Sequence, residues 1–204
     1  AGQSCNSTSR IFLHESIHDE TVDHLARLFR SLKVWLPDAP GTEMGALTSR
    51  PQFDKTMSYI RLALLEGATL RAGGRPPDDP ALANGFFVSP TLFVDVTPQM
   101  RIAKEEVFGP VAAVLRWSDE EEMLRAVNGL DFGLTAAVWS RNIDEAMRIS
   151  SRIDAGYLWI NDAATHHLGV PFGGFKQSGY GREESFDELV ECTQVKNVSL
   201  RFKS

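Results

Sequence analysis

Val111-Ala112-Ala113-Val114-Leu115 is an unbroken run of apolar residues that directly follows the pair Gly109-Pro110. Strands that are buried on both faces of a parallel sheet carry such continuous runs, whereas half-exposed strands alternate apolar and polar side chains. The run therefore predicts a buried strand that extends to Trp117. The next residues, Ser118-Asp119-Glu120-Glu121, predict a helix through Val127, because they supply a cap and place acids at the positive end of the helix dipole.

The rest of the chain alternates between predicted strands and predicted helices. Apolar periodicity predicts further helices at residues 18–32, 51–66 and 142–153, and further strands at residues 10–17, 68–72, 86–88, 91–96, 134–139 and 156–161. The predicted buried face of the helix near Pro51 consists of Phe53, Met57, Ile60, Leu64 and Leu65. Strands separated by helices imply right-handed crossovers and a parallel sheet, so the predicted fold class is α/β.

Composition argues against several classes of function. The chain has 204 residues, 43% of them hydrophobic, which suffices for one core. A formal net charge of -6 argues against a nucleic-acid or anionic-membrane surface, and no apolar run approaches the length of a membrane span. Two cysteines, Cys5 and Cys192, are too few for a disulfide framework and favour a reducing, cytoplasmic location. Because the chain starts without a methionine, we expect it to be a piece of a longer protein.

Cys5 is the first candidate for chemistry. It lies between small and polar residues, Gly2-Gln3-Ser4 before it and Asn6-Ser7 after it, rather than inside an apolar run. A turn of this kind leaves a thiol accessible and exposes backbone N–H groups, which favour the thiolate and can hold an oxyanion at the carbon that it attacks. The alternative, from these residues alone, is an unreactive free cysteine on a loop.

Two later stretches are also candidates. In Ile102–Val111, the adjacent acids Glu105 and Glu106 point about 100° apart on a helix, so they do not form a shared-proton pair. The alternative to a functional role for this stretch is that the two glutamates simply form an ordinary acidic helix end. The stretch Pro171–Glu183 is rich in glycine but lacks the strand, Gly-x-Gly-x-x-Gly and helix arrangement of a dinucleotide site. It is better explained as a loop that packs closely against other backbone.

Taken in order, these motifs resemble the carboxyl-terminal part of the aldehyde dehydrogenase family. Gly2-Gln3-Ser4-Cys5 resembles the nucleophile motif, and Lys104-Glu105-Glu106-Val107-Phe108-Gly109-Pro110-Val111 resembles the nicotinamide-ribose motif. Trp159-Ile160-Asn161 and Pro171–Glu183 resemble the substrate-loop signature. The resemblance covers essentially the whole chain. It implies an aldehyde dehydrogenase catalytic domain at residues 1–192, with a parallel, mixed-edge sheet flanked by helices, and an oligomerisation strand and tail at 193–204.

The resemblance also implies a role for individual residues. Cys5 would attack the aldehyde and form a thiohemiacetal, hydride would pass to NAD or NADP, and water would hydrolyse the resulting thioester to a carboxylic acid. Glu106 would hold the ribose hydroxyls of the cofactor, and Phe108 would pack beside the nicotinamide ring. Gln52 and Lys55 match positions that reach the cofactor in relatives, although both could equally be solvated helix residues.

Substrate contacts follow from the same resemblance. Ser4 and Asn6 would flank the sulfur, Asn161 belongs to the substrate-loop signature, and Phe172 would form an aromatic wall of the aldehyde tunnel. His166 and His167 would lie at the tunnel mouth. They are not expected to bind a metal, because neighbouring side chains diverge and no third ligand has suitable spacing for zinc. Glu184-Ser185 departs from the commonest family pattern, and with the two histidines it suggests aromatic or amine-derived aldehydes.

The resemblance also implies a partner for the tail and bears on the activity of the chain. The alternating residues Val195, Val198, Leu200 and Phe202 resemble a strand that relatives lend to a neighbouring subunit, which implies a homo-oligomer, a dimer or a tetramer. The cofactor domain and the general-base glutamate of the family have no counterpart in this chain, so the isolated piece is expected to be inactive. Two alternatives stay open: a binding or structural module of the same fold, and a thiol esterase.

Overall fold

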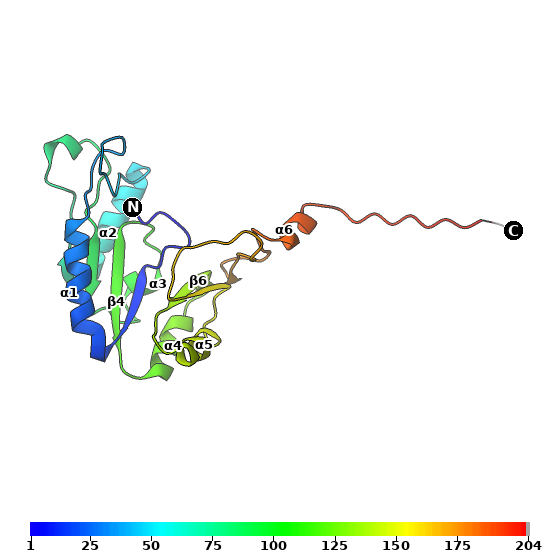
Figure 1. Cartoon of the computed structure of the whole chain (residues 1–204). Coiled ribbons are helices and arrows are strands. Elements are labelled where there is room, and N and C mark those ends of the chain that lie inside the picture. The colour runs from blue at the N-terminus through cyan, green and yellow to red at the C-terminus, as the bar shows by residue number, and fades with distance from the viewer. Residues whose placement is uncertain (203–204) are drawn as a thin grey trace. The chain divides into compact units, whose positions relative to one another are not determined.

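The computed structural model describes residues 1–202 and divides the chain into two compact units (Figure 1). The first unit is Ala1–Leu130 and the second begins at Asp131. Each unit contains its own sheets and helices and is described by itself. The boundary expected between residues 192 and 193 stays a prediction. Within residues 1–202, no helix has the length and apolar character needed to cross a membrane.

The first unit is built on a four-stranded sheet. Its strand order is β1 (Arg10–His14), β4 (Val111–Trp117), β3 (Thr91–Val94) and β2 (Thr69–Ala72). Both β1 and β3 run parallel to the central strand β4, and β2 pairs antiparallel with β3 at the edge. This arrangement confirms the predicted α/β fold with a mixed-edge sheet.

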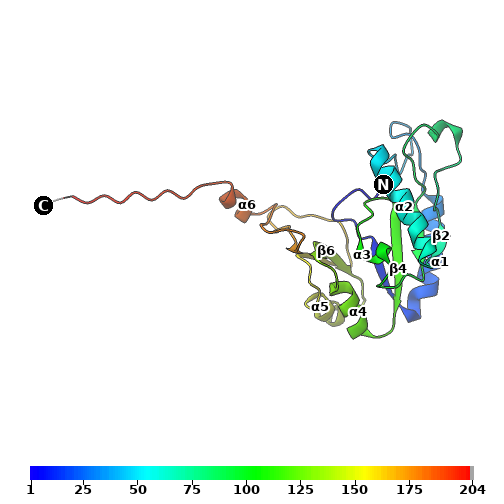
Figure 2. The same ribbon diagram turned by 180° about the vertical axis from the view of Figure 1, so that it is seen from behind.

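Helices cover both faces of this sheet. Alternate residues of the strands pack against α1 (Glu15–Ser31) on one face, in a core that includes Val22, Val114 and Leu92. The other face packs against α2 (Arg50–Leu65) and α3 (Arg101–Lys104), in a core that includes Ile60 and Phe93. Figures 1 and 2 show the sheet from opposite sides, with α1 nearer the viewer in Figure 1 and α2 nearer in Figure 2. A short 3-10 helix, Pro80–Leu82, lies in the connection between β2 and β3.

The central strand matches its predicted bounds, and the helix after it starts close to where it was expected. The side chain of Asp119 accepts a hydrogen bond from the backbone N–H of Glu122 and caps α4 (Glu120–Asn128). The guanidinium of Arg10 donates to the backbone oxygens of Ala126 and Val127, both at 3.2 Å. Arg10 therefore ties the start of β1 to the last turn of α4.

Three expectations for the first unit were wrong in detail. The first helix starts at Glu15 rather than at residue 18, and the strand before it ends at His14 rather than at residue 17, because the side chain of His14 accepts a hydrogen bond from Ser16 N and caps the helix. Leu64 and Leu65 were expected to be buried but are exposed, since the buried stripe of α2 passes through Thr56, Ile60 and Ala63 instead. Residues 86–88 are packed but form no strand.

The second unit contains two small sheets. The short strands β5 (Phe132–Gly133) and β8 (Phe175–Lys176) pair antiparallel. The strands β6 (Thr135–Val138) and β7 (Tyr157–Ile160) pair parallel and are joined through α5 (Ile143–Ser150), which is the predicted crossover. The single strand expected at residues 134–139 is thus divided between β5 and β6, with Leu134 in between.

The last helix, α6 (Phe186–Glu191), is followed by the tail that was expected to be a strand. Residues 194–202 form no strand in this chain (Figure 1). The apolar side chains of Val195, Val198, Leu200 and Phe202 are between 74% and 97% exposed. Pairing of this tail with a second chain stays a prediction.

Candidate active site

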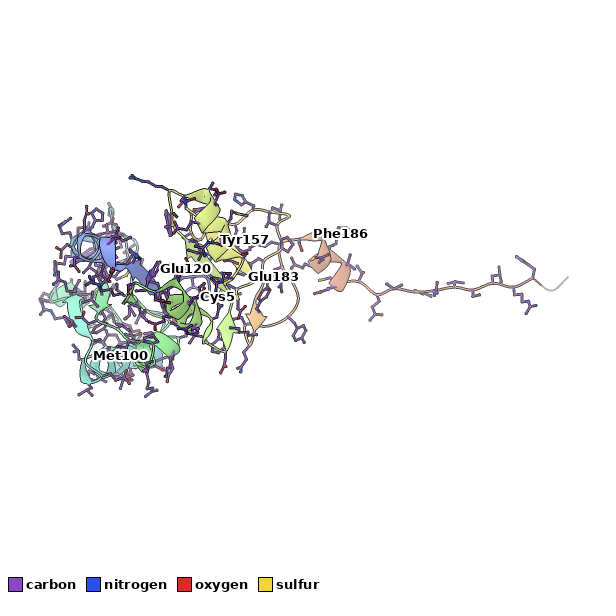
Figure 3. All side chains as sticks on the ribbon, turned by 90° about the horizontal axis from the view of Figure 1, so that it is seen from below. Cys5, Met100, Glu120, Tyr157, Glu183 and Phe186 are labelled. Carbon is purple, nitrogen blue, oxygen red and sulfur yellow. The ribbon has the colours of Figure 1, made fainter. Side chains whose placement is uncertain are left out.

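The thiol of Cys5 is exposed, as expected for a reactive cysteine (Figure 3). Cys5 lies in a tight turn in which the backbone N–H of Ser7 donates to the oxygen of Ser4 at 3.1 Å. The Ser4 hydroxyl donates to the side-chain oxygen of Asn6 at 2.5 Å. This contact between Ser4 and Asn6 stabilises the turn, and their predicted role beside the sulfur in the substrate site stays a prediction.

The loop that carries Cys5 is held to the rest of the first unit at several points. Gly2 has a φ of +68° and lies against Gly109, so that a Cβ at Gly2 would lie 2.2 Å from the Gly109 oxygen. Gln3 and Thr48 form two hydrogen bonds of 3.0 Å, one from side chain to side chain and one from the Thr48 N–H to Gln3 Oε1. Beyond the cysteine, Ala113 N donates to Ser9 O. The exposed thiol is thus presented by a fixed loop.

The turn that contains Phe108 lies beside the amino-terminal half of α2. Phe108 has a φ of +56°, which is uncommon for a residue with a bulky side chain. The side-chain nitrogen of Gln52 donates to the oxygens of Val107 and Phe108, each at 2.8 Å. Thr56, one turn further along α2, packs against Gly109 so closely that a Cβ at Gly109 would lie 2.6 Å from its hydroxyl oxygen.

The two adjacent glutamates have different environments. Glu105 accepts hydrogen bonds from the Arg101 guanidinium, at 2.7 and 2.8 Å, and from the Tyr59 hydroxyl. The bonds from Arg101 first, and from Tyr59 second, lower the pKa of Glu105 from its ordinary value of 4.5 to about 2. Glu106 is exposed. Both residues follow α3, which ends at Lys104, so the expectation that they lie on a helix was wrong. Glu105 is engaged by Arg101 and Tyr59, and Glu106 is the more exposed of the two.

Gln52, Lys55 and Tyr59 share one face of α2. Their spacing of three, four and seven residues places them on neighbouring turns of a helix. The ammonium of Lys55 lies 5.9 Å from the centre of the Tyr59 ring, and the Arg101 guanidinium lies 5.7 Å from it. Tyr59 and Arg101 were not among the residues singled out from the sequence. The spacing of Arg101 and Glu105, four residues apart, was a signal that could have identified the ion pair between these two residues.

The remaining predicted site residues belong to the second unit. The side chain of Asn161 donates to the oxygen of Ser140 at 2.9 Å and accepts from the Ser140 N–H at 3.0 Å. Asn161, with a φ of +55°, thus links the ends of β6 and β7. Phe172 is 8% exposed and is paired through its backbone with Glu183. The predicted substrate contacts of Asn161 and Phe172 stay predictions.

Phe172 belongs to an aromatic cluster that contains Tyr157, Trp159, His166 and Phe172. Figure 3 marks Tyr157 and Glu183 in this unit. The His166 ring stacks on the Tyr157 ring, with 5.7 Å between the ring centres and 12° between the planes. Its Nδ1 lies 2.9 and 3.0 Å from the two carboxylate oxygens of Glu184. The sequence singled out His166 and Glu184 separately and missed the pair that they form.

The glycine-rich loop packs closely against other backbone, as predicted. A Cβ at Gly156 would lie 1.9 Å from the oxygen of Gly173, and a Cβ at Gly174 would lie 2.3 Å from the Ser178 side chain. Among residues 1–202, no group of three His, Cys, Asp or Glu residues is arranged to hold a metal ion. The expected absence of a metal stays a prediction.

Comparison with known proteins identifies the family. Residues 1–198 match the sequence model of the aldehyde dehydrogenase family. The chain belongs to this family. An aldehyde dehydrogenase of Talaromyces stipitatus is 48% identical over 204 residues, which covers 98% of this chain and 40% of that protein. A betaine aldehyde dehydrogenase of Brucella anthropi is 42% identical over 197 residues, which covers 97% of this chain and 40% of that protein.

Solved structures of the family share the fold. The crystal structure of betaine aldehyde dehydrogenase from Staphylococcus aureus in complex with NAD+ superimposes with a TM-score of 0.91 at 35% sequence identity. The match covers 98% of this chain and 42% of that structure. An aldehyde dehydrogenase from Bacillus cereus, a G224D mutant, gives a TM-score of 0.90 at 40% identity and covers 96% of this chain and 39% of that one. The chain thus spans about 40% of the length of the relatives that it matches.

Proposed function

We propose that this chain provides the nucleophile and part of the cofactor site of an NAD(P)-dependent aldehyde dehydrogenase. The observation that carries the proposal is the contact of the Cys5 loop, through Gly2, with Gly109 of the turn that bears Glu106 and Phe108. Through this contact, the loop that carries the exposed thiol of Cys5 packs against the turn that carries the exposed carboxylate of Glu106, within the same unit. Family membership, with residues 1–198 matched, supports the reaction class.

The residues of the turn fit a nicotinamide cofactor. Glu106 is exposed and offers carboxylate oxygens as acceptors for two ribose hydroxyls. Phe108 is half-buried and offers a flat apolar surface for a ring. A bound nicotinamide cofactor would supply the hydride acceptor. Lys55 is partly exposed on the same helix as Gln52, and its ammonium would contribute positive charge near a phosphate group.

Cys5 acts first in the proposed reaction. Its thiolate sulfur forms a bond to the carbonyl carbon of the aldehyde, and the carbonyl electron pair moves to the oxygen. The backbone N–H of Cys5 donates to that oxygen and stabilises its negative charge. After the carbon has lost hydride, the thioester at Cys5 is hydrolysed by water, which releases the carboxylic acid and restores the thiol.

The substrate class and the assembly are finer proposals. Several relatives are betaine aldehyde dehydrogenases, which supports a small, amine-derived aldehyde as substrate. The exposed alternating residues Val195, Val198, Leu200 and Phe202 support pairing of the tail with a second copy of the chain, because unpaired apolar strands seek partners. Two exposed free cysteines support a reducing, cytoplasmic location.

A thiol esterase is the second candidate, because an exposed thiol can form and break an acyl-enzyme without a cofactor. One experiment separates the candidates. The full-length protein is given betaine aldehyde, an aromatic aldehyde or an aliphatic aldehyde with NAD or NADP, and the absorbance of reduced nicotinamide is followed beside hydrolysis of a nitrophenyl ester. Aldehyde-dependent reduction supports the proposal. Ester hydrolysis alone would identify an esterase, and neither activity would identify a binding module.

A further inference from the structure

Gln52 was expected to contact the cofactor, but its side chain already has two partners. Its amide nitrogen donates to the oxygens of Val107 and Phe108, both at 2.8 Å. A side-chain amide has two N–H donors, and backbone oxygens only accept, so this orientation of the amide is required by chemistry. Both donors of Gln52 are therefore used within the protein, and only its oxygen is left for any ligand.

The two oxygens belong to a turn whose conformation needs support. Phe108 adopts a φ of +56°, in a region that residues with side chains seldom occupy. Val107, the preceding residue, is 5% exposed, so its oxygen would lose a hydrogen bond without gaining full access to water if Gln52 were removed. Gln52 therefore satisfies the backbone at the position where the turn is strained.

The helix provides a rigid base for this contact. The backbone N–H of Gln52 lies 3.4 Å from the hydroxyl oxygen of Ser49, which caps α2. The Thr56 hydroxyl donates to the backbone oxygen of Gln52 at 2.9 Å and packs against Gly109. Tyr59, one turn further on, donates to Glu105. Three successive turns of α2 thus hold the segment 105–109 on either side of Glu106.

We propose that Gln52 is a positioning residue that fixes the Phe108 turn, and so the direction of the Glu106 carboxylate, before any cofactor binds. The part that concerns Glu106 rests on the proposed function. The bonds of Gln52 to the turn do not depend on it. A direct cofactor ligand would leave the turn unchanged when it was replaced, whereas a positioning residue would not.

The test uses Gln52→Met, which keeps the length of the side chain and removes both donors. Amide hydrogen exchange is measured without cofactor in the full-length protein, at two backbone N–H groups that border the turn. Glu105 N donates to Arg101 O, and Val111 N donates to Gly109 O. We expect exchange at these amides to become about tenfold or more faster, because local opening is easier once the two oxygens lose their donors. The matched control is Gln177→Met, at an exposed glutamine of the second unit.

A second variant keeps the test decisive if the methionine protein folds poorly. Gln52→Lys restores N–H donors but not the amide oxygen, and we expect its exchange to stay within about twofold of the wild type. Calorimetry with NAD is run on the same proteins. Unchanged exchange in Gln52→Met would overturn the proposal, and weaker NAD binding in the same variant would then make Gln52 a direct ligand. Fast exchange in Gln52→Lys would also overturn it. If the wild type fails to oxidise aldehydes, the proposed function fails, but the exchange result still decides the role of Gln52 in the turn.

Discussion

Gly2 and Gly109 approach each other so closely that a side chain at Gly2 would collide with the backbone oxygen of Gly109, at 2.2 Å from the new Cβ. Gly2 lies three residues before Cys5, and Gly109 directly follows Phe108. The contact joins the start of the chain to a turn more than 100 residues later, and it does so next to the first residues of β4. The position of the thiol relative to the Glu106 turn is therefore set by backbone packing.

Replacement of Gly2 by alanine tests this contact. The expected cost has two parts, about 1–2 kcal/mol for a side chain at positive φ and a further 1–3 kcal/mol, roughly, for the overlap with Gly109. Gly67→Ala is the matched control, because Gly67 has a φ of +98° and open space around it. Urea unfolding of the full-length protein and the alkylation rate of Cys5 are measured for both. Equal losses of stability in the two variants, with unchanged alkylation of Cys5, would show that the overlap with Gly109 has no effect.

The environment of Glu105 predicts a dependence of stability on pH. The folded protein lowers the pKa of this carboxyl from 4.5 to about 2, so the charged form stabilises the fold above about pH 4.5. That contribution is lost as the pH falls through the interval down to about 2. The pKa of Tyr59 is raised, by burial first and by the bond to Glu105 second, so its hydroxyl remains a donor throughout this range.

The measurement is the free energy of unfolding of wild type and Glu105→Gln between neutral and acid pH. We expect the variant to be less stable at neutral pH and the difference to shrink as the pH falls below 4.5. Glu20→Gln, at an exposed position of α1, controls for the loss of one negative charge. A difference that stays constant over the whole range would contradict the assigned hydrogen bonds.

Glu106 is predicted to position the cofactor and to take no proton. Its carboxylate is exposed on a turn whose backbone is held by Gln52. In the full-length protein, Glu106→Gln should lower the rate of aldehyde-dependent NAD reduction by about tenfold to a hundredfold, since the amide is a poorer acceptor for ribose hydroxyls. Hydrolysis of a nitrophenyl ester should change little. If both rates fell equally, Glu106 would have to act as a base for water instead.

The chain alone is predicted to bind NAD only at millimolar strength or more weakly. The contacts offered by Glu106 and Phe108 are few, and association costs several kcal/mol of lost translational and rotational freedom, roughly 4 or more. Calorimetry with NAD and an assay of aldehyde oxidation on the 204-residue chain check this. Micromolar binding accompanied by turnover would contradict it. Light scattering on the same sample tests whether the exposed tail forms dimers or larger species.

Much of the first unit could be predicted because its signals are local. The strand β4 matches its predicted bounds, since a continuous apolar run stands between Gly109-Pro110 and the capping residues of α4. The start of α1 was missed because its cap is His14, which is not among the residues that commonly cap helices. The exposed ends of α2, Leu64 and Leu65, were misassigned because apolar residues at helical spacing do not reveal which side of the helix meets the sheet.

The candidate site was only partly accessible to sequence reasoning. Cys5 and Glu106 could be recognised as candidate functional residues from the short motifs around them. The bonds from Gln52 to Val107 and Phe108 join positions 55 and 56 residues apart, so no local pattern reports them. The pair formed by His166 and Glu184 likewise depends on the fold of a loop, with 18 residues between its members. Both cysteines are exposed, so exposure alone does not distinguish Cys5 from Cys192.

The central claim is that Cys5 is the nucleophile, and replacement of each cysteine in the full-length protein tests it most directly. The measurement is the rate of aldehyde-dependent NAD reduction in Cys5→Ala, with Cys192→Ala as the matched control at the other exposed thiol. We expect Cys5→Ala to lose activity by about a thousandfold or more, because removal of a covalent nucleophile leaves only binding and electrostatic contributions. Cys192→Ala should retain activity within about twofold of the wild type. A Cys5→Ala protein that still oxidises the aldehyde at the wild-type rate would contradict the assignment.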